Sequence, residues 1–89
     1  NVGKGVEKIT CLNCVKPKYP KLAIQRGYEG TLKLKVTIQK NGLVKDIIVT
    51  GSTGYEILDK AGIKAAQESK FYPLSKKSEL NIVYDLKLN

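Results

Sequence analysis

Hydrophobic and polar residues alternate most regularly between residues 31 and 39. The apolar positions are Leu32, Leu34, Val36 and Ile38, with Thr, Lys or Gln around them. A period of two with one apolar side is typical of a β-strand that buries one face. Asn41-Gly42 follows and favours a tight type I′ hairpin turn. The pattern therefore predicts a strand, opened by Gly30, that turns into an antiparallel partner.

The partner strand is predicted over residues 43–50, where the alternation is imperfect. Val44 points to one side, whereas Ile47 and Val49 point to the other. A bulge near Lys45-Asp46 would reconcile them, because one extra residue reverses the side on which later residues lie.

The last segment of the chain alternates cleanly and predicts a third strand. One side consists of Leu80, Ile82, Tyr84, Leu86 and Leu88, and the other of Asn81, Val83, Asp85, Lys87 and Asn89. Between Leu80 and Leu88 there is neither Pro nor Gly, and charge occurs only at Asp85 and Lys87.

A short helix is predicted near residues 20–26, ahead of the first strand. Pro20 suits the first helical position, where its missing N–H costs nothing, and Gly27 can end the helix in a left-handed conformation. A helix of about two turns does not persist alone in water, so it must pack on the rest of the fold.

A longer helix is predicted between the second and third strands, up to about Lys70. Thr53-x-x-Glu56 is a candidate capping box at its start, and Pro73 lies just beyond its end. One side of this helix carries mainly small residues, namely Leu58, Ala61, Gly62, Ala65, Ala66 and Ser69. Such a side lets a helix lie close against a sheet.

These elements predict an α+β fold, with two helices on one face of a three-stranded antiparallel or mixed sheet. The hairpin makes the first two strands neighbours, and the preference for right-handed crossovers places the third beside the first. The strand order is then 2-1-3, and the third strand is an edge. Edge strands usually carry protective charges, prolines or bulges. An edge without them is either a strip for strand addition by a partner or is covered by the linker or another subunit.

Composition restricts the function classes. The chain has 89 residues, enough for one domain, and carries 16 basic against 8 acidic residues, for a net charge of +8. All basic residues except Arg26 are lysines, spread along the chain. This favours a solvated surface biased toward acidic partners or membrane surfaces over specific nucleic-acid reading, which uses Arg and stacking aromatics. There is no signal peptide and no run of about 18 apolar residues that could span a membrane.

The sequence offers little for catalysis. It has no His, its acids are scattered, and Cys11 and Cys14 lack a base, so we interpret the chain as a non-enzyme without cofactor or metal. Zinc is disfavoured because a structural site needs four ligands. The Cys-x-x-Cys pair is therefore either a local disulfide or two free thiols. It lies in residues 1–15, which we interpret as a linker end before a domain at 16–89.

The order of these motifs resembles the C-terminal domain of TonB, the periplasmic energy transducer of Gram-negative bacteria. The resemblance covers roughly residues 15–89. It rests on Tyr19-Pro20, Gly27 and Gly30, the alternating strand to Asn41-Gly42, Ser52-x-Gly54, Leu58-Asp59-x-Ala61, Ala65-Ala66 and Phe71-x-Pro73. No single motif is specific, but their order and spacing together are.

The resemblance implies a function and a site. Such domains bind the Ton box, a short peptide of outer-membrane TonB-dependent transporters, and relay proton-motive-force energy gathered with ExbB and ExbD. The transporters import siderophore-bound iron, haem, cobalamin or other metal chelates. The Ton box pairs with the last strand, which here is Leu80, Asn81, Ile82, Val83, Tyr84, Asp85, Leu86 and Lys87. Receptor contacts are implied for Tyr19 and Pro20, and nearby Arg26 is a further candidate.

The resemblance also implies a periplasmic location, with an inner-membrane anchor outside this chain. A periplasmic location favours a disulfide between Cys11 and Cys14, although this pair is not a general family feature. The alternatives are a TolA-like adaptor with the same edge and other partners, a basic nucleic-acid-binding module, or a redox or metal protein with reactive thiols. An open edge also permits a homodimer of the fragment.

Overall fold

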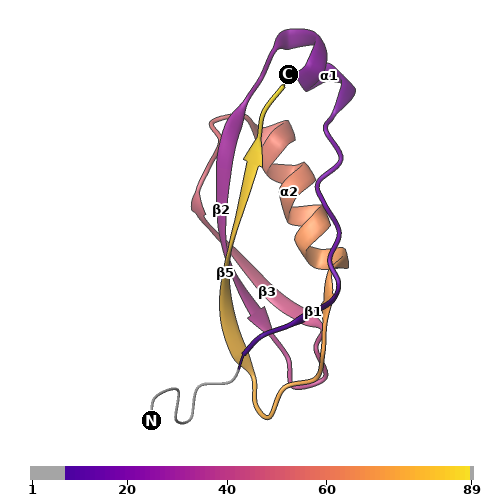
Figure 1. Cartoon of the computed structure of the whole chain (residues 1–89). Helices are drawn as coiled ribbons and strands as arrows, with labels where there is room; N and C mark the ends of the chain where they lie inside the picture. The colour runs from indigo at the N-terminus through magenta and orange to yellow at the C-terminus, as the bar shows by residue number, and fades with distance from the viewer. Residues whose placement is uncertain (1–7, 89) are drawn as a thin grey trace.

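The computed structural model describes residues 8–88, which form two helices and five strands (Figure 1). In chain order these are β1 (Cys11–Asn13), α1 (Lys21–Arg26), β2 (Gly30–Ile38), β3 (Val44–Gly51), α2 (Glu56–Glu68), β4 (Lys70–Phe71) and β5 (Ser78–Leu86). Residues 1–7 of the predicted linker end lie outside the described part of the chain. The predicted α+β fold, with helices packed on an antiparallel sheet, is confirmed.

The main sheet has the order β3-β2-β5, which confirms the predicted order 2-1-3. β2 and β5 pair antiparallel without a register shift, from Gly30 opposite Leu86 to Ile38 opposite Ser78. β2 and β3 are also antiparallel, but Lys45 has no partner on β2. This confirms the predicted bulge. A second irregularity near Lys33 was not predicted.

One face of the sheet and α2 enclose the main core. Its fully buried large side chains are Leu32, Leu34, Val36 and Ile38. The predicted small side of α2 does allow a close approach, because a Cβ added at Gly62 would come within 2.1 Å of the Leu32 Cδ2. Figure 1 shows α2 lying along the long strands rather than at their ends.

The short helix α1 lies at the end of the sheet where β5 finishes (Figure 1). Its buried Ala23 packs in a second cluster with Leu58 and Leu86. Gly27 ends the helix at φ 69°, as predicted, but Pro20 is the N-cap residue rather than the first helical one.

The β2–β3 turn is not the predicted type I′ turn. Type I′ needs positive φ at both central residues, and only Gly42, at φ 90°, has it here. The Gly42 amide donates to the Gln39 carbonyl and the Gln39 amide to the Leu43 carbonyl, each at 2.8 Å. The turn thus holds three residues, with the Leu43 amide bonded to the Asn41 side chain.

Both ends of α2 also differ from the prediction. Tyr55 is the N-cap residue and makes no side-chain capping bond, so the predicted capping box is wrong. The Thr53 hydroxyl bonds to the Asp59 carboxylate at 2.6 Å instead. The helix stops at Glu68 rather than near Lys70, because the next residues form β4, whose Phe71 amide donates to the Gly42 carbonyl.

Residues 8–20 are tied to the rest of the fold at several points. β1 pairs antiparallel with β4, and Ile9 packs against the main core. Beyond β1, residues 14–20, which we call the N-terminal strap, run beside α2 to the start of α1 (Figure 1). The segment interpreted as a linker end therefore contributes to the folded unit from residue 9 onward.

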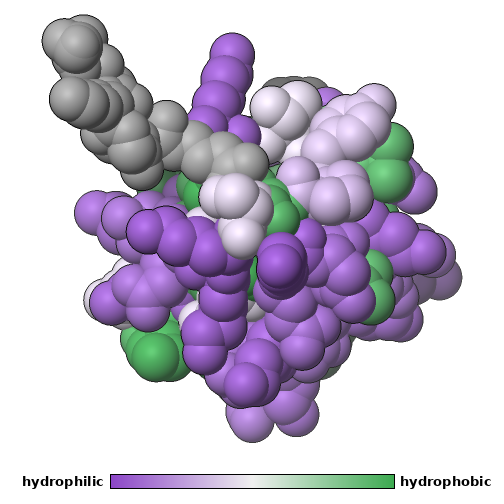
Figure 2. Space-filling model, turned by 90° about the horizontal axis from the view of Figure 1, so that it is seen from below, coloured by the Kyte–Doolittle hydropathy of each residue, from purple (hydrophilic) through white to green (hydrophobic). Residues whose placement is uncertain are grey.

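The end of the molecule opposite α1 is mainly hydrophilic. Figure 2 views this end and shows polar side chains over most of it, with small apolar areas between them. Three loops meet here, since the Tyr72 amide bonds to the Thr10 carbonyl and the Leu74 amide to the Lys40 carbonyl. No helix within residues 8–88 has the length and apolar character needed to cross a membrane.

Candidate functional site: a groove beside an edge strand

β5 pairs with β2 along one edge, and its other edge has no strand partner among residues 8–88. Its inward side chains are half-buried or buried, namely Leu80, Ile82, Tyr84 and Leu86. Asn81, Val83 and Asp85 are exposed between them, and Lys87 follows the end of the strand. The residues implied for the Ton-box site therefore do form one continuous edge segment.

A groove of about 350 Å³ lies beside the second half of this strand. One wall is β5 and the residue after it, from Val83 to Lys87, and the other consists of Lys16, Pro17 and Tyr19 of the N-terminal strap. The strap stands opposite the edge without joining the sheet. The alternative in which the chain's own linker fills this edge as a strand does not apply to the described residues.

Tyr19 holds the C-terminal end of the N-terminal strap in place. Its hydroxyl donates a hydrogen bond to the Tyr28 carbonyl, just after α1. The Tyr28 ring stacks on Tyr55, with centroids 4.0 Å apart. The strap is thus attached to the end of the fold formed by α1 and the start of α2.

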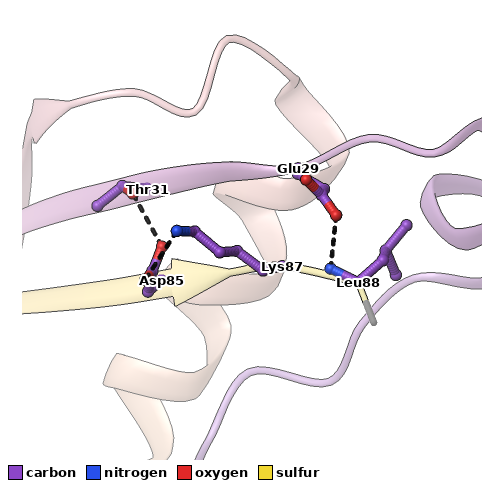
Figure 3. A network of polar contacts seen from close by, with 5 residues as sticks. All are labelled: Glu29, Thr31, Asp85, Lys87 and Leu88. Carbon is purple, nitrogen blue, oxygen red and sulfur yellow. Dashed lines mark hydrogen bonds and ion pairs between the residues drawn. The ribbon is translucent and has the colours of Figure 1, made fainter.

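The far end of β5 is held on the side of β2, as Figure 3 shows. The Thr31 hydroxyl donates to the Asp85 carboxylate at 3.0 Å, and Lys87 pairs with the same carboxylate at 3.6 Å. The Leu88 amide donates to the Glu29 carboxylate at 2.8 Å. These bonds hold residues 85–88 beside β2.

Tyr84 and Ser69 connect the inner face of β5 to the end of α2. Burial raises the pKa of the Tyr84 phenol, and a hydrogen bond with Ser69 partly opposes this. Ser69 is itself only 3% exposed, and its hydroxyl donates to the Ala65 carbonyl at 2.8 Å. The middle of the edge strand is therefore attached to the end of α2 through Tyr84 and Ser69.

The other predicted receptor contacts do not share this groove. Pro20 lines a second hollow on the opposite side of the strap, against α2. Arg26 lies in the last turn of α1, where its Nη1 is 3.4 Å from the Tyr28 hydroxyl, and it lines neither hollow. Lys16 and Pro17 also line the groove, and neither was predicted from the sequence, although a proline-fixed extended segment before Tyr19 could have indicated a wall at this place.

The structure joins Cys11, on the exposed strand β1, to Cys14, which follows that strand, in a disulfide with Cα atoms 5.8 Å apart. Among residues 8–88 there is no group of three or more His, Cys, Asp or Glu side chains placed to hold a metal ion. What the groove offers chemically is a row of backbone amides and carbonyls beside exposed lysines.

The comparisons with known proteins agree with this architecture. The family described as Gram-negative bacterial TonB protein C-terminal matches residues 15–89. The chain is similar to Protein tonB2 of Pseudomonas aeruginosa, with 40% identity over 78 residues that cover 82% of this chain and 29% of that protein. It is similar to Protein TonB of Vibrio cholerae, with 34% identity over 59 residues, 66% of this chain and 24% of that one. The chain thus spans less than a third of the length of these relatives.

Solved structures of TonB C-terminal domains are also similar to this chain. The solution structure of the Pseudomonas aeruginosa TonB CTD superposes with a TM-score of 0.79 at 26% identity, covering 97% of this chain and 92% of that one. The Helicobacter pylori TonB-CTD (residues 179-285) superposes with a TM-score of 0.67 at 32% identity, covering 82% of this chain and 70% of that one.

Proposed function

Because the chain belongs to the family of Gram-negative bacterial TonB C-terminal domains, we propose that it binds the Ton box of an outer-membrane TonB-dependent transporter by strand addition to β5. The observation that carries the proposal is the groove beside the unpaired edge of β5. An extended peptide there would continue the sheet to the order β3-β2-β5-peptide. Backbone hydrogen bonds would supply affinity, and alternate side chains would supply selectivity.

The polar groups at the C-terminal end of β5 leave room for a bound peptide. Asp85 is engaged by Thr31 and Lys87, and Glu29 holds the Leu88 amide, so none of these groups closes the groove. Lys16 and Lys87 stand at its two walls. They favour a peptide without excess positive charge.

Backbone pairing also suits reversible coupling. Each hydrogen bond contributes about 0.5–1.5 kcal/mol net, and the loss of translational and rotational freedom cancels much of the sum. We therefore expect micromolar affinity, which corresponds to about −8 kcal/mol. Since the backbone is common to all peptides, one domain could serve several transporters.

In the whole protein this domain would relay energy to the transporter. We propose a periplasmic domain, joined through a segment outside this chain to the inner membrane and to ExbB and ExbD, that serves uptake of siderophore-iron, haem, cobalamin or other metal chelates. If a pulling force runs along β5, the hydrogen bonds of the added strand share the load in shear.

The test is an NMR titration of the isotope-labelled chain with a Ton-box peptide. We expect amide shifts concentrated at residues 83–87 and at Lys16 to Tyr19. Two control peptides, N-methylated at odd or at even positions, each lack the amide donors on one of their two edges. Only the peptide methylated on the edge that faces β5 should lose binding, and equal binding by both would contradict backbone pairing.

Variants of the chain provide a matched check. Neighbouring amides of a strand point to opposite edges, so Ile82→Pro and Val83→Pro remove one donor toward β2 and one toward the groove. The variant that removes the outward donor should keep its fold by circular dichroism and lose peptide binding. If both proline variants fold and both bind the peptide as tightly as the parent chain, the β5 edge is excluded as the site.

A further inference from the structure

A second and larger hollow, of about 480 Å³, lies on the other side of the N-terminal strap, between the strap and α2. Its apolar part consists of Val15, Tyr19, Pro20, Ala61 and Ala65. Four lysines surround these residues: Lys16, Lys18 and Lys21 from the strap and the start of α1, and Lys64 from α2. We call this hollow the basic groove. Its size is within the usual range of ligand-binding clefts.

The four lysines of the basic groove make no ion pair that would stabilise the fold within the described residues. All four are exposed, and none forms an ion pair within residues 8–88. The contrast on α2 is direct. Lys60 pairs with Glu56 one turn earlier at 3.5 Å. Lys64 and Glu68 are also four residues apart, but in the reverse order, and they line the groove without forming an ion pair with each other.

We propose that the basic groove binds an acidic, extended peptide segment of a partner protein. Four unpaired cations around one carboxylate give the groove a positive potential, which attracts and orients an anionic segment. The apolar wall formed by Val15, Ala61 and Ala65 can take an aliphatic side chain between the acidic ones. The pattern of positive rim and apolar floor therefore matches a peptide that alternates acidic and apolar residues.

The same observations disfavour a nucleic acid. Its recognition uses stacked aromatic rings and Arg forks, and the groove holds one aromatic residue and no Arg. That residue, Tyr19, already uses its hydroxyl to bond to the Tyr28 carbonyl.

The basic groove is separate from the edge groove, although Lys16 and Tyr19 contribute to both. It lies against α2 rather than β5, so this inference does not rest on strand addition. The two sites also have different reporters in solution. Binding in the basic groove perturbs residues 61–68, and binding at the edge perturbs residues 83–87.

The test is an NMR titration of the full 89-residue chain at low salt with an acetylated, amidated octapeptide of alternating Glu and Val. We expect amide shifts at Val15, Lys18, Ala61, Lys64 and Ala65. The same peptide with Gln in place of Glu should bind about tenfold more weakly or not at all, because the attraction between charges is lost.

Charge reversal supplies the matched control. The double variant Lys18→Glu, Lys64→Glu should weaken the acidic peptide about tenfold, since attraction becomes repulsion at two positions. The double variant Lys33→Glu, Lys45→Glu changes the net charge equally at exposed sites outside the groove and should leave affinity within about twofold. Circular dichroism establishes that both variants fold.

Several results would overturn the proposal. Equal weakening in the two double variants would show a response to net charge alone, and shifts confined to residues 83–87 would place the peptide at the edge. An octathymidylate that binds the groove residues more tightly than the acidic peptide would assign them to a nucleic acid. The absence of any shift at residues 61–68 would exclude the site.

Discussion

The backbone amide of Val15 donates a hydrogen bond of 3.0 Å to the hydroxyl of Ser69, across 54 residues of sequence. Ser69 directly follows α2 and also donates to the Ala65 carbonyl. One buried hydroxyl therefore attaches the N-terminal strap to the helix, and both grooves depend on the position of that strap.

Ser69→Ala should loosen the strap without unfolding the sheet. The substitution leaves the partly buried Val15 amide without its partner, which costs about 1–3 kcal/mol. Hydrogen exchange should accelerate most at Val15, and thermal unfolding should report the loss of stability. Ser78→Ala, which removes an exposed bond to the Lys76 carbonyl, is the control and should change little. Unchanged exchange at Val15 would contradict the role assigned to Ser69.

Gly62→Ala should destabilise the chain, although alanine is the better helix former. The new methyl group would lie 2.1 Å from the Leu32 Cδ2, and overpacking of this kind costs about 1–3 kcal/mol. Gln67→Ala on the exposed side of the same helix should stay within about 0.5 kcal/mol of the parent. Denaturant unfolding measures both, and a Gly62→Ala variant as stable as the parent would show that α2 can move away from β2.

The Asp59 carboxylate should make stability depend on acid pH. Partial burial raises its pKa, but hydrogen bonds from Ser52 and Thr53 outweigh this and hold the pKa below its ordinary value. A folded-state pKa below the unfolded value contributes stability above the unfolded pKa, and this stability is lost as the pH falls through the folded value. Asp59→Asn should therefore be less stable than the parent at pH 7, with the difference shrinking below about pH 4.

Urea unfolding at pH 7, 5, 4 and 3 measures this dependence. Asp46→Asn, on the exposed side of β3, is the matched control. A difference between Asp59→Asn and the parent that stays constant from pH 7 to pH 3 would refute the role of the ionised carboxylate.

The disulfide between Cys11 and Cys14 should be present in the oxidised chain and contribute little stability. Alkylation of the unreduced protein should label no cysteine in mass spectrometry. Replacing both with Ser should lower stability by at most about 2 kcal/mol, because the closed loop is short. Faster hydrogen exchange should be confined to β1 and β4. Two alkylated thiols in protein purified without reductant would exclude the bridge.

Local sequence patterns predicted much of the fold correctly. The alternation of Leu32 to Ile38 placed the central strand, and the reversal around Lys45 placed the bulge, because a strand with one dry face imposes a period of two. Gly27 marked the end of α1, since its positive φ is a property of the single residue. The clean alternation from Leu80 located β5, and the motif order indicated the family.

Contacts between distant segments decided the rest. The sequence predicts Phe71 at the end of a helix, yet it belongs to β4, because it pairs with Cys11 of β1 and its amide donates to the Gly42 carbonyl. The closeness of β4 to the β2–β3 turn also requires glycine at position 42, because a Cβ there would lie 1.9 Å from the Phe71 carbonyl oxygen.

The sequence by itself determined which residues form the three long strands and which face of each is dry, because these follow from spacing along one segment. The hairpin and the handedness of crossovers then placed the third strand at an edge. Only the tertiary structure decided that the N-terminal strap stands across from that edge and against α2, and so creates two grooves. That placement depends on single bonds such as Val15 to Ser69 and Tyr19 to Tyr28, which join residues whose proximity no local period encodes.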